Sequence, residues 1–464
     1  MNCVGFRKLG ISVAVAGALS AGVSQAHAAA FALIEQNGSG LGNAYAGAAA
    51  AAEDASTIHF NPAGMSLLPG GKQFAFGVDL INPSFKFGDN GSLASGTGIP
   101  VGAALRPLGS TGGDAGSLAA VPHFYFAMDV AKDWKIGVGV GAPFGLKTEY
   151  SGDWEGRFQG IKSDIKTINV NPTVSYKVND KVSLGFGLNY QRIDAELTQA
   201  VNYVAGTFGG VLAATGSLAA AGAVAGAIPA ASAEGTVAIK GSDSAWGYNL
   251  GAMFQLSPQT RLGVAYRSSI KYNVAGTANF SGTPAGLPAA AAAGFSSGNV
   301  SADIKVPDTL SLALNHQLNQ KWTLLGDLTW TGWAKLKELR FVRDTGVTLG
   351  ATPENFRNTL RAGIGAIYRY NDQWSSKVGL AYDQTPVNNI DRTPRLPDEN
   401  RTWLSIGGQY RPSKATTLDF GYAHLFVRDA SINQNAGSTP GYGMLTGNYK
   451  NSADILGVQF SYRF

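Results

Sequence analysis

Residues 455–464 at the C-terminus, ILGVQFSYRF, alternate between large apolar side chains and mostly small or polar ones. A period of two is typical of a β-strand with one apolar face. A half-buried strand of a soluble sandwich would also alternate, but here the apolar face is continuous, as in a barrel with lipid outside and water inside. That face comprises Leu456, Val458, Phe460, Tyr462 and Phe464, and the other comprises Ile455, Gly457, Gln459, Ser461 and Arg463.

The same alternation recurs in fourteen segments of the chain. An even number of strands is what single-chain bacterial barrels show when both termini lie on the periplasmic side. The predicted fold is therefore all-β, a transmembrane antiparallel β-barrel of 14 strands. The predicted strands are residues 72–87, 120–131, 134–150, 161–178, 181–198, 242–256, 259–275, 302–318, 321–342, 356–370, 373–387, 401–411, 414–429 and 449–464.

The connections between these segments alternate between tight turns and long loops. Transmembrane barrels place short turns on the periplasmic side and long loops outside, whereas a soluble sandwich has no reason to sort its loops in this way. The third long loop, residues 199–241, is rich in Ala and Gly and is predicted to be either a flexible segment or a pair of short apolar helices. The turns are residues 131–133, 179–180, 257–258, 319–320, 371–372 and 412–413, and the long loops are 88–119, 151–160, 199–241, 276–301, 343–355, 388–400 and 430–448.

The composition and the N-terminus agree with a barrel. Hydrophobic residues make up 45% and charged residues 14% of the 464 residues, against a usual charged fraction of about 25%. Residues 1–28 are predicted to be a secretory signal peptide, because Arg7 and Lys8 precede a short apolar run and an Ala-His-Ala cleavage site. The only cysteine, Cys3, lies in this leader. A net charge of +5 is too small to indicate nucleic acid as a partner.

Residues 29–70 are predicted to fill the lumen of a barrel formed by residues 71–464. The stretch from Gly38 to Met65 is crowded with Gly and Ala and has few bulky apolar side chains, so it cannot build a core of its own. Near its end, Asn61-Pro62-Ala63 has a local interpretation, because Asn is a good helix N-cap and Pro suits the first helical position.

This N-terminal stretch also resembles a known family. The order F-x-x-x-E-x-x-x-SGLG-x-AY-x-G from Phe31, then Glu53-Asp54, then Asn61-Pro62-Ala63, is similar to the N-terminal hatch of the FadL family of outer-membrane transporters. The resemblance implies passive uptake of long-chain fatty acids or other hydrophobic compounds across the outer membrane of a Gram-negative bacterium. It implies capture by the outer loops, an apolar lumen site and movement of the hatch.

The third predicted strand contains a proline. Pro cannot donate to a sheet ladder, so Pro143 must sit at a bulge or a break, which serves either barrel shape alone or a function. In the FadL family the third strand kinks inward and opens a gap in the wall. The resemblance therefore predicts a lateral gate at Ala142-Pro143-Phe144-Gly145.

Three positions are predicted to contact substrate. Arg357 and Arg361 share the inward face of strand ten, and the stretch that begins at Phe356 resembles a family segment whose second residue is basic and close to the bound head group. Leu197 follows the sequence YQRIDAE, which resembles the family pattern Y-x-R-x-x-x-E, but stands where some fatty-acid members have a basic residue. This departure leaves an aromatic hydrocarbon open as the substrate.

Two other function classes are considered. A porin-like channel for small polar solutes has no use for a plug, and a surface receptor would carry an inert barrel. No enzyme, metal or cofactor is expected, because the histidines are not spaced as a metal pair and no nucleophile motif is present. The expected partners are hydrophobic small molecules, outer-membrane lipid and lipopolysaccharide, and the barrel-assembly machinery, with a monomeric protein.

Overall fold

The computed structural model describes residues 30–435 and 441–464, so the predicted signal peptide lies outside the described residues. The predicted antiparallel barrel of 14 strands is confirmed. Six of the 14 wall strands each consist of two consecutive pieces, namely β3/β4, β8/β9, β10/β11, β12/β13, β14/β15 and β18/β19. The strands are β1 (Lys72–Asp89), β2 (Ala119–Ala131), β3 (Trp134–Gly141), β4 (Gly145–Glu149), β5 (Lys162–Lys177), β6 (Val182–Asn202), β7 (Glu234–Ser257), β8 (Thr260–Arg267), β9 (Ile270–Ser281), β10 (Gly298–Val306), β11 (Thr309–Gln317), β12 (Trp322–Thr331), β13 (Glu338–Arg343), β14 (Thr348–Pro353), β15 (Thr359–Arg369), β16 (Trp374–Asp383), β17 (Arg401–Tyr410), β18 (Thr416–Val427), β19 (Ala430–Asn435) and β20 (Met444–Arg463).

The barrel closes where β1 pairs with β20, from Gln73 opposite Arg463 to Asp89 opposite Gly447. Alternation along β20 follows the sequence pattern. Leu456 is 52% exposed on the outer face, whereas the neighbouring Ile455 is 0% exposed on the inner face. Apolar side chains therefore cover the outside of the cylinder, as a lipid-facing surface requires.

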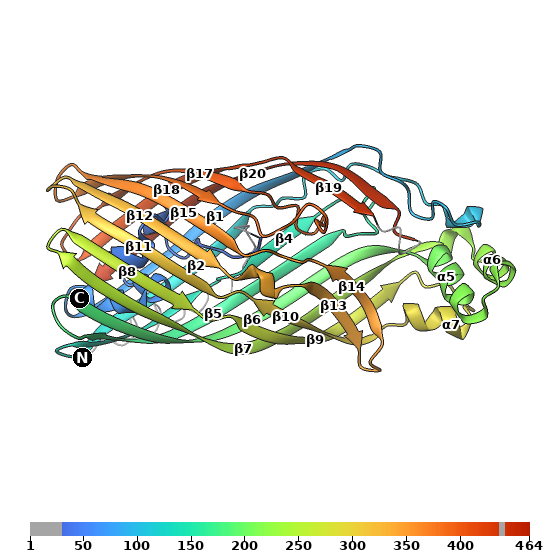
Figure 1. The fold of residues 1–464 in the computed structure, drawn as a ribbon, viewed down its shortest axis with the longest axis horizontal. Helices are drawn as coiled ribbons and strands as arrows, with labels where there is room; N and C mark the ends of the chain where they lie inside the picture. Colours follow the sequence, from blue (N-terminus) through green and yellow to red (C-terminus); the bar gives the residue numbers. More distant parts are fainter. Residues whose placement is uncertain (1–29, 436–440) are drawn as a thin grey trace, which may run out of the picture.

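The two ends of the cylinder differ (Figure 1). The C-terminus and the tight turns lie at one end, and the helices α5 (Tyr203–Thr215), α6 (Leu218–Gly226) and α7 (Ala289–Ala292) lie at the other. The helices α5 and α6 bear out the interpretation of the third long loop as a pair of short apolar helices. The hairpin beneath them is longer than predicted, because β6 and β7 stay paired as far as Asn202 and Glu234. In the described part of the chain, no helix is long and apolar enough to cross a membrane.

Residues 30–70, here called the hatch, lie inside the cylinder (Figure 1). They form α2 (Gly38–Leu41), α3 (Ala48–Ala51), α4 (Thr57–Phe60) and the 3-10 helix η1 (Pro62–Leu67). Glycines on the inner face of the wall let the hatch backbone approach closely. A Cβ on Gly263 would overlap the carbonyl oxygen of Ala49, and a Cβ on Gly379 would overlap the carbonyl group of Asn43.

The third wall strand breaks at Ala142-Pro143-Phe144, between β3 and β4. β3 pairs with both β2 and β5, whereas β4 pairs with β5 alone. Within the described residues, the outer part of β2, residues 119–123, pairs with β1 and has no ladder partner in β4. The wall therefore lacks a continuous ladder between β2 and β4.

Three further strands that the sequence predicts to be continuous are interrupted in the structure. The seventh wall strand is interrupted after Arg267, the eighth at Pro307, and the ninth after Thr331, where η5 (Trp333–Lys335) turns inward. Trp333 is 1% exposed and belongs to the lumen core. These breaks surround the same region of the lumen and shape a cavity there.

Candidate functional site

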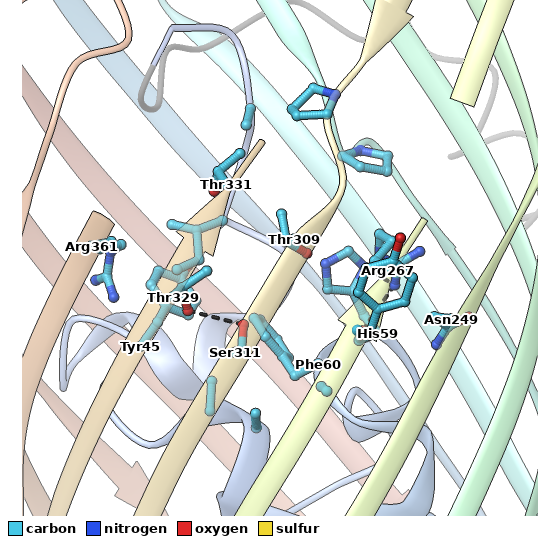
Figure 2. A pocket seen from close by; sticks show the side chains of 18 of the residues that line it. Tyr45, His59, Phe60, Asn249, Arg267, Thr309, Ser311, Thr329, Thr331 and Arg361 are labelled. Carbon is cyan, nitrogen blue, oxygen red and sulfur yellow. Dashed lines mark hydrogen bonds between the residues drawn. The ribbon is translucent and has the colours of Figure 1, made fainter. Parts of the chain in front are cut away.

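A cavity of about 160 Å³ lies between the hatch and the barrel wall (Figure 2). Its apolar lining comes from both parts of the protein: Leu33, Ile34 and Phe60 from the hatch, and Phe144 and Trp333 from the wall. Phe31 packs against Trp333 with ring centroids 4.8 Å apart. A largely apolar cavity with a few polar groups at its edges suits a hydrophobic ligand.

Arg361 lies at one side of the cavity (Figure 2). Its guanidinium group pairs with Asp327 at 3.3 Å and donates to the carbonyl oxygen of Ala44 in the hatch. Asp383 lies opposite Arg361 in the ladder between β15 and β16 and also lines the cavity. Arg361 is therefore an already paired cation in acidic surroundings.

Arg267 lies at the other side, beside His59 and Asn249 (Figure 2). Its Nη2 atom donates to the carbonyl oxygen of His59 at 2.9 Å and lies 3.3 Å from the His59 Nδ1 atom. Its Nη1 atom donates to the side-chain oxygen of Asn189. The Asn189 side chain and the His59 carbonyl carry no charge. The His59 ring is neutral as well, since burial and the nearby Arg267 lower the pKa of His59 well below its usual value.

Asn61-Pro62-Ala63 joins the hatch to the wall. The Asn61 side chain caps η1 by accepting from the Ala63 N–H at 3.1 Å, so the local capping interpretation is confirmed. Its amide nitrogen also donates to Ala49 in the hatch, at 2.7 Å, and to the backbone of the wall at Ala252, at 3.1 Å. One side chain thus holds three segments together.

The backbone groups freed at the strand break are bonded to the start of the hatch. Leu33 N–H donates to the Pro143 carbonyl, and Gly145 N–H donates to the Phe31 carbonyl, each at 2.8 Å. The Gln36 side chain donates to the Ala142 carbonyl at 2.8 Å. The first residues of the hatch therefore replace the missing strand partner at this point.

The predicted substrate positions are not brought together. Arg361 lines the cavity, whereas Arg357 is exposed, is not among the lining residues, and donates to the carbonyl oxygen of Thr385 at 3.1 Å. Leu197 lines a separate apolar cavity of about 20 Å³ with Ile165 and Val274. Arg267 is not among the residues predicted from the sequence to contact substrate, and the alternation that puts it on the inward face of its strand is the only sequence signal for it.

Lys377 forms a second contact between hatch and wall, away from this cavity. Its ammonium group lies 2.9 Å from Glu53 and 3.2 Å from Asp419, and it donates to the carbonyl oxygen of Ser39 at 2.7 Å. The Lys377 side chain is 2% exposed. Glu53 and Asp419 also line a polar cavity of about 680 Å³ at the end of the barrel that carries the tight turns.

Comparisons with known proteins identify the family. The model of the outer membrane protein transport protein family (OMPP1/FadL/TodX) matches residues 19–464. Outer membrane protein P1 of Haemophilus influenzae is 29% identical over 407 residues, 86% of each chain. The long-chain fatty acid transport protein of Escherichia coli is 27% identical over 466 residues, 99% of each chain.

Solved structures agree. A Pseudomonas aeruginosa FadL homologue superposes with a TM-score of 0.82 at 26% identity, covering 94% of this chain and 100% of that one. The toluene transporter TodX of P. putida shares the fold, with a TM-score of 0.60 at 19% identity over 88% of this chain and 94% of that one. The resemblance seen in the sequence is confirmed. The chain belongs to the OMPP1/FadL/TodX family of transport proteins, and its place is the outer membrane of a Gram-negative bacterium.

Proposed function

We propose that this protein is a passive transporter that takes up long-chain fatty acids or aromatic hydrocarbons across the outer membrane. The observation that carries the proposal is the apolar cavity between hatch and wall, which reaches Pro143 and Phe144 at the strand break. Relatives named as a fatty acid transport protein and as a toluene transporter support both substrate classes. The protein supplies an apolar route and no chemistry.

Substrate enters from the outer end. The helices α5 and α6 pack around an apolar cluster that includes Val204, Phe208 and Val211, and this cluster is the first landing site. Below it, the cavity lined by Leu197 leads into the apolar side chains of the lumen core. Burial of apolar surface, at roughly 25 cal/mol per Å², draws the substrate inward.

Substrate leaves sideways through the gap between β2 and β4. The break at Pro143 removes ladder bonds from the wall, and the hatch fills the lumen below. The hydrogen bonds from Leu33 and Gly145 across the break must open for the route to widen. Movement of the hatch and opening of the gate are therefore one event in this mechanism.

The porin-like alternative is less well supported. A channel for polar solutes needs a water-filled lumen, whereas the hatch lies across this lumen and is tied to the wall by Asn61 and Lys377. Uptake of oleate and toluene by liposomes that contain the protein, against sucrose, separates the two functions. We expect oleate or toluene to enter and sucrose to stay out, and entry of sucrose alone would refute the proposal.

The lateral exit has its own test. Deletion of Pro143 and Phe144 straightens the third wall strand and preserves the inward and outward register of its neighbours. We expect an assembled, heat-resistant barrel that binds ligand from outside but shows only background uptake. The matched control deletes Asp344 and Thr345 from the exposed turn between β13 and β14 and keeps uptake. Uptake at the parent rate after the first deletion would show that substrate passes through the hatch instead.

A further inference from the structure

Arg267 differs in its partners from Arg361, the other arginine in the cavity lining. Among the described residues, no carboxylate lies within ion-pair distance of Arg267, whereas Arg361 pairs with Asp327 at 3.3 Å. The described hydrogen bonds of Arg267 go to Asn189 and His59, which are neutral. A cation inside the lumen without a counter-ion is costly, and an anion that arrives there is stabilised.

The two sides of the cavity therefore present different charges to a ligand. At the Arg361 side, Asp327 and Asp383 also line the cavity, so a ligand carboxylate would meet two acidic side chains. At the Arg267 side the lining neighbours are His59, Asn249 and uncharged groups. An anionic head group is thus favoured at Arg267 and opposed at Arg361.

From this asymmetry we propose that Arg267 binds the carboxylate of an acidic ligand, while the apolar part of that ligand runs toward Phe144 and Trp333. This inference rests on the proposed function and names the residue that selects acids over neutral compounds. A guanidinium group presents five N–H donors in a planar fork that matches a carboxylate. Asn249 lies beside Arg267 in the lining and supplies a further polar contact.

The size of the cavity determines how the ligand lies. A cavity of about 150 Å³ takes a benzene-sized molecule, and this one measures about 160 Å³. It therefore holds one ring or the first part of an alkyl chain. Because Pro143 and Phe144 are themselves in the lining, the remainder of a long chain extends toward the strand break, in the direction of the proposed exit.

The test compares dodecanoate with 1-dodecanol, which have equal chain lengths and different head groups. Binding of each to the purified full-length barrel is measured at pH 8 by calorimetry. We expect the parent to bind dodecanoate about ten- to hundred-fold more tightly, the worth of a charge-assisted hydrogen bond. Arg267→Met should abolish this preference and leave dodecanol binding within about two-fold, because only the charged head group is affected.

Two further variants control for folding and for loss of charge in general. Arg267→Lys keeps the charge without the fork and should retain part of the preference, so it replaces Arg267→Met if that variant fails to assemble. Arg261→Met makes the same change on the inward face of the same strand, where Arg261 donates to the Ala51 carbonyl at 2.9 Å and does not line the cavity. It should keep the full preference.

The outcomes separate the two claims. If the parent binds or takes up dodecanol or toluene but shows no preference for dodecanoate, the assignment of Arg267 is wrong and the transport function stands. The assignment is equally wrong if Arg267→Met or Arg267→Lys keeps the whole preference. If the parent neither binds nor takes up any of these compounds, the proposed function fails and the assignment fails with it.

Discussion

Replacing Lys377 by Met should loosen the hatch. The Lys377 ammonium group is buried between Glu53 of the hatch and Asp419 of β18, and it also donates to the Ser39 carbonyl of the hatch. Met has a similar length and no charge, so the change removes these interactions with little change in volume. The wall and the hatch then lose a shared cation.

The magnitude follows from the burial of the two acids. Asp419 is 2% exposed and would be left as an unpaired buried carboxylate, although Gln409 still donates to it at 2.7 Å. Removing one partner of a buried pair costs about 3–5 kcal/mol. Glu53 is 23% exposed and can turn to water, so Glu53→Gln should cost only about 1 kcal/mol. Adding Asp419→Asn to Lys377→Met should restore most of the loss, because position 419 then no longer carries an unpaired charge.

Two measurements check this prediction. Guanidinium unfolding of the purified barrel in detergent gives the stability differences, and conductance in planar bilayers reports how often the lumen opens. We expect Lys377→Met to open measurably more often than the parent and the double variant to return toward the parent. The reasoning is refuted if Lys377→Met matches the parent within about 0.5 kcal/mol, or if the double variant is as unstable as the single one.

Three further changes probe the hatch and the site. Gly379→Ala should destabilise hatch packing by about 1–3 kcal/mol, because the new Cβ would overlap Asn43. The effect should be seen as faster proteolysis of the hatch. Gly326→Ala is the control and should have no such effect, since the nearest atom to its Cβ would be 3.9 Å away. Burial raises the pKa of Glu35 from 4.5 to about 7, so the folded protein holds this proton more tightly than the unfolded chain does. The denaturant midpoint of unfolding should therefore fall as the pH rises from about 4.5 to about 7. Glu35→Gln should remove that part of the pH dependence. Arg357→Ala should leave dodecanoate binding within about two-fold, since Arg357 is exposed outside the cavity. A ten-fold loss of affinity in calorimetry would instead show that Arg357 binds the head group.

The strands and turns were predictable because a barrel wall has only two faces. In β20, the alternation between Leu456 outside and Ile455 inside is local information, and it fixes which face meets lipid. The break at Pro143 was predictable for the same local reason, since Pro has no N–H to donate. The break after Arg267 was not, because Ser268 and Ser269 carry no signal that forbids a ladder.

The site was less predictable, because the alternation along a strand shows which face a side chain lies on but not its height in the barrel or its contact partners. Arg357 and Arg361 share one parity, yet only Arg361 lines the cavity. That Arg267 meets the neutral partners His59 and Asn189 depends on which parts of the hatch and of β6 come near it. Those approaches are long-range contacts, which no stretch of the sequence specifies alone.

The hatch has two roles in the geometry of this barrel, and they cannot be separated. Its first residues bond to the carbonyl of Pro143 and to the N–H of Gly145, where the wall lacks a ladder between β2 and β4. Its later residues fill the lumen and bond to the wall through Asn61. A buried backbone group that loses its partner costs about 1–3 kcal/mol, so the break is stable only while the hatch start stays in place. Any displacement that frees the cavity at Phe144 must also leave these backbone groups to be satisfied anew, by water or by each other.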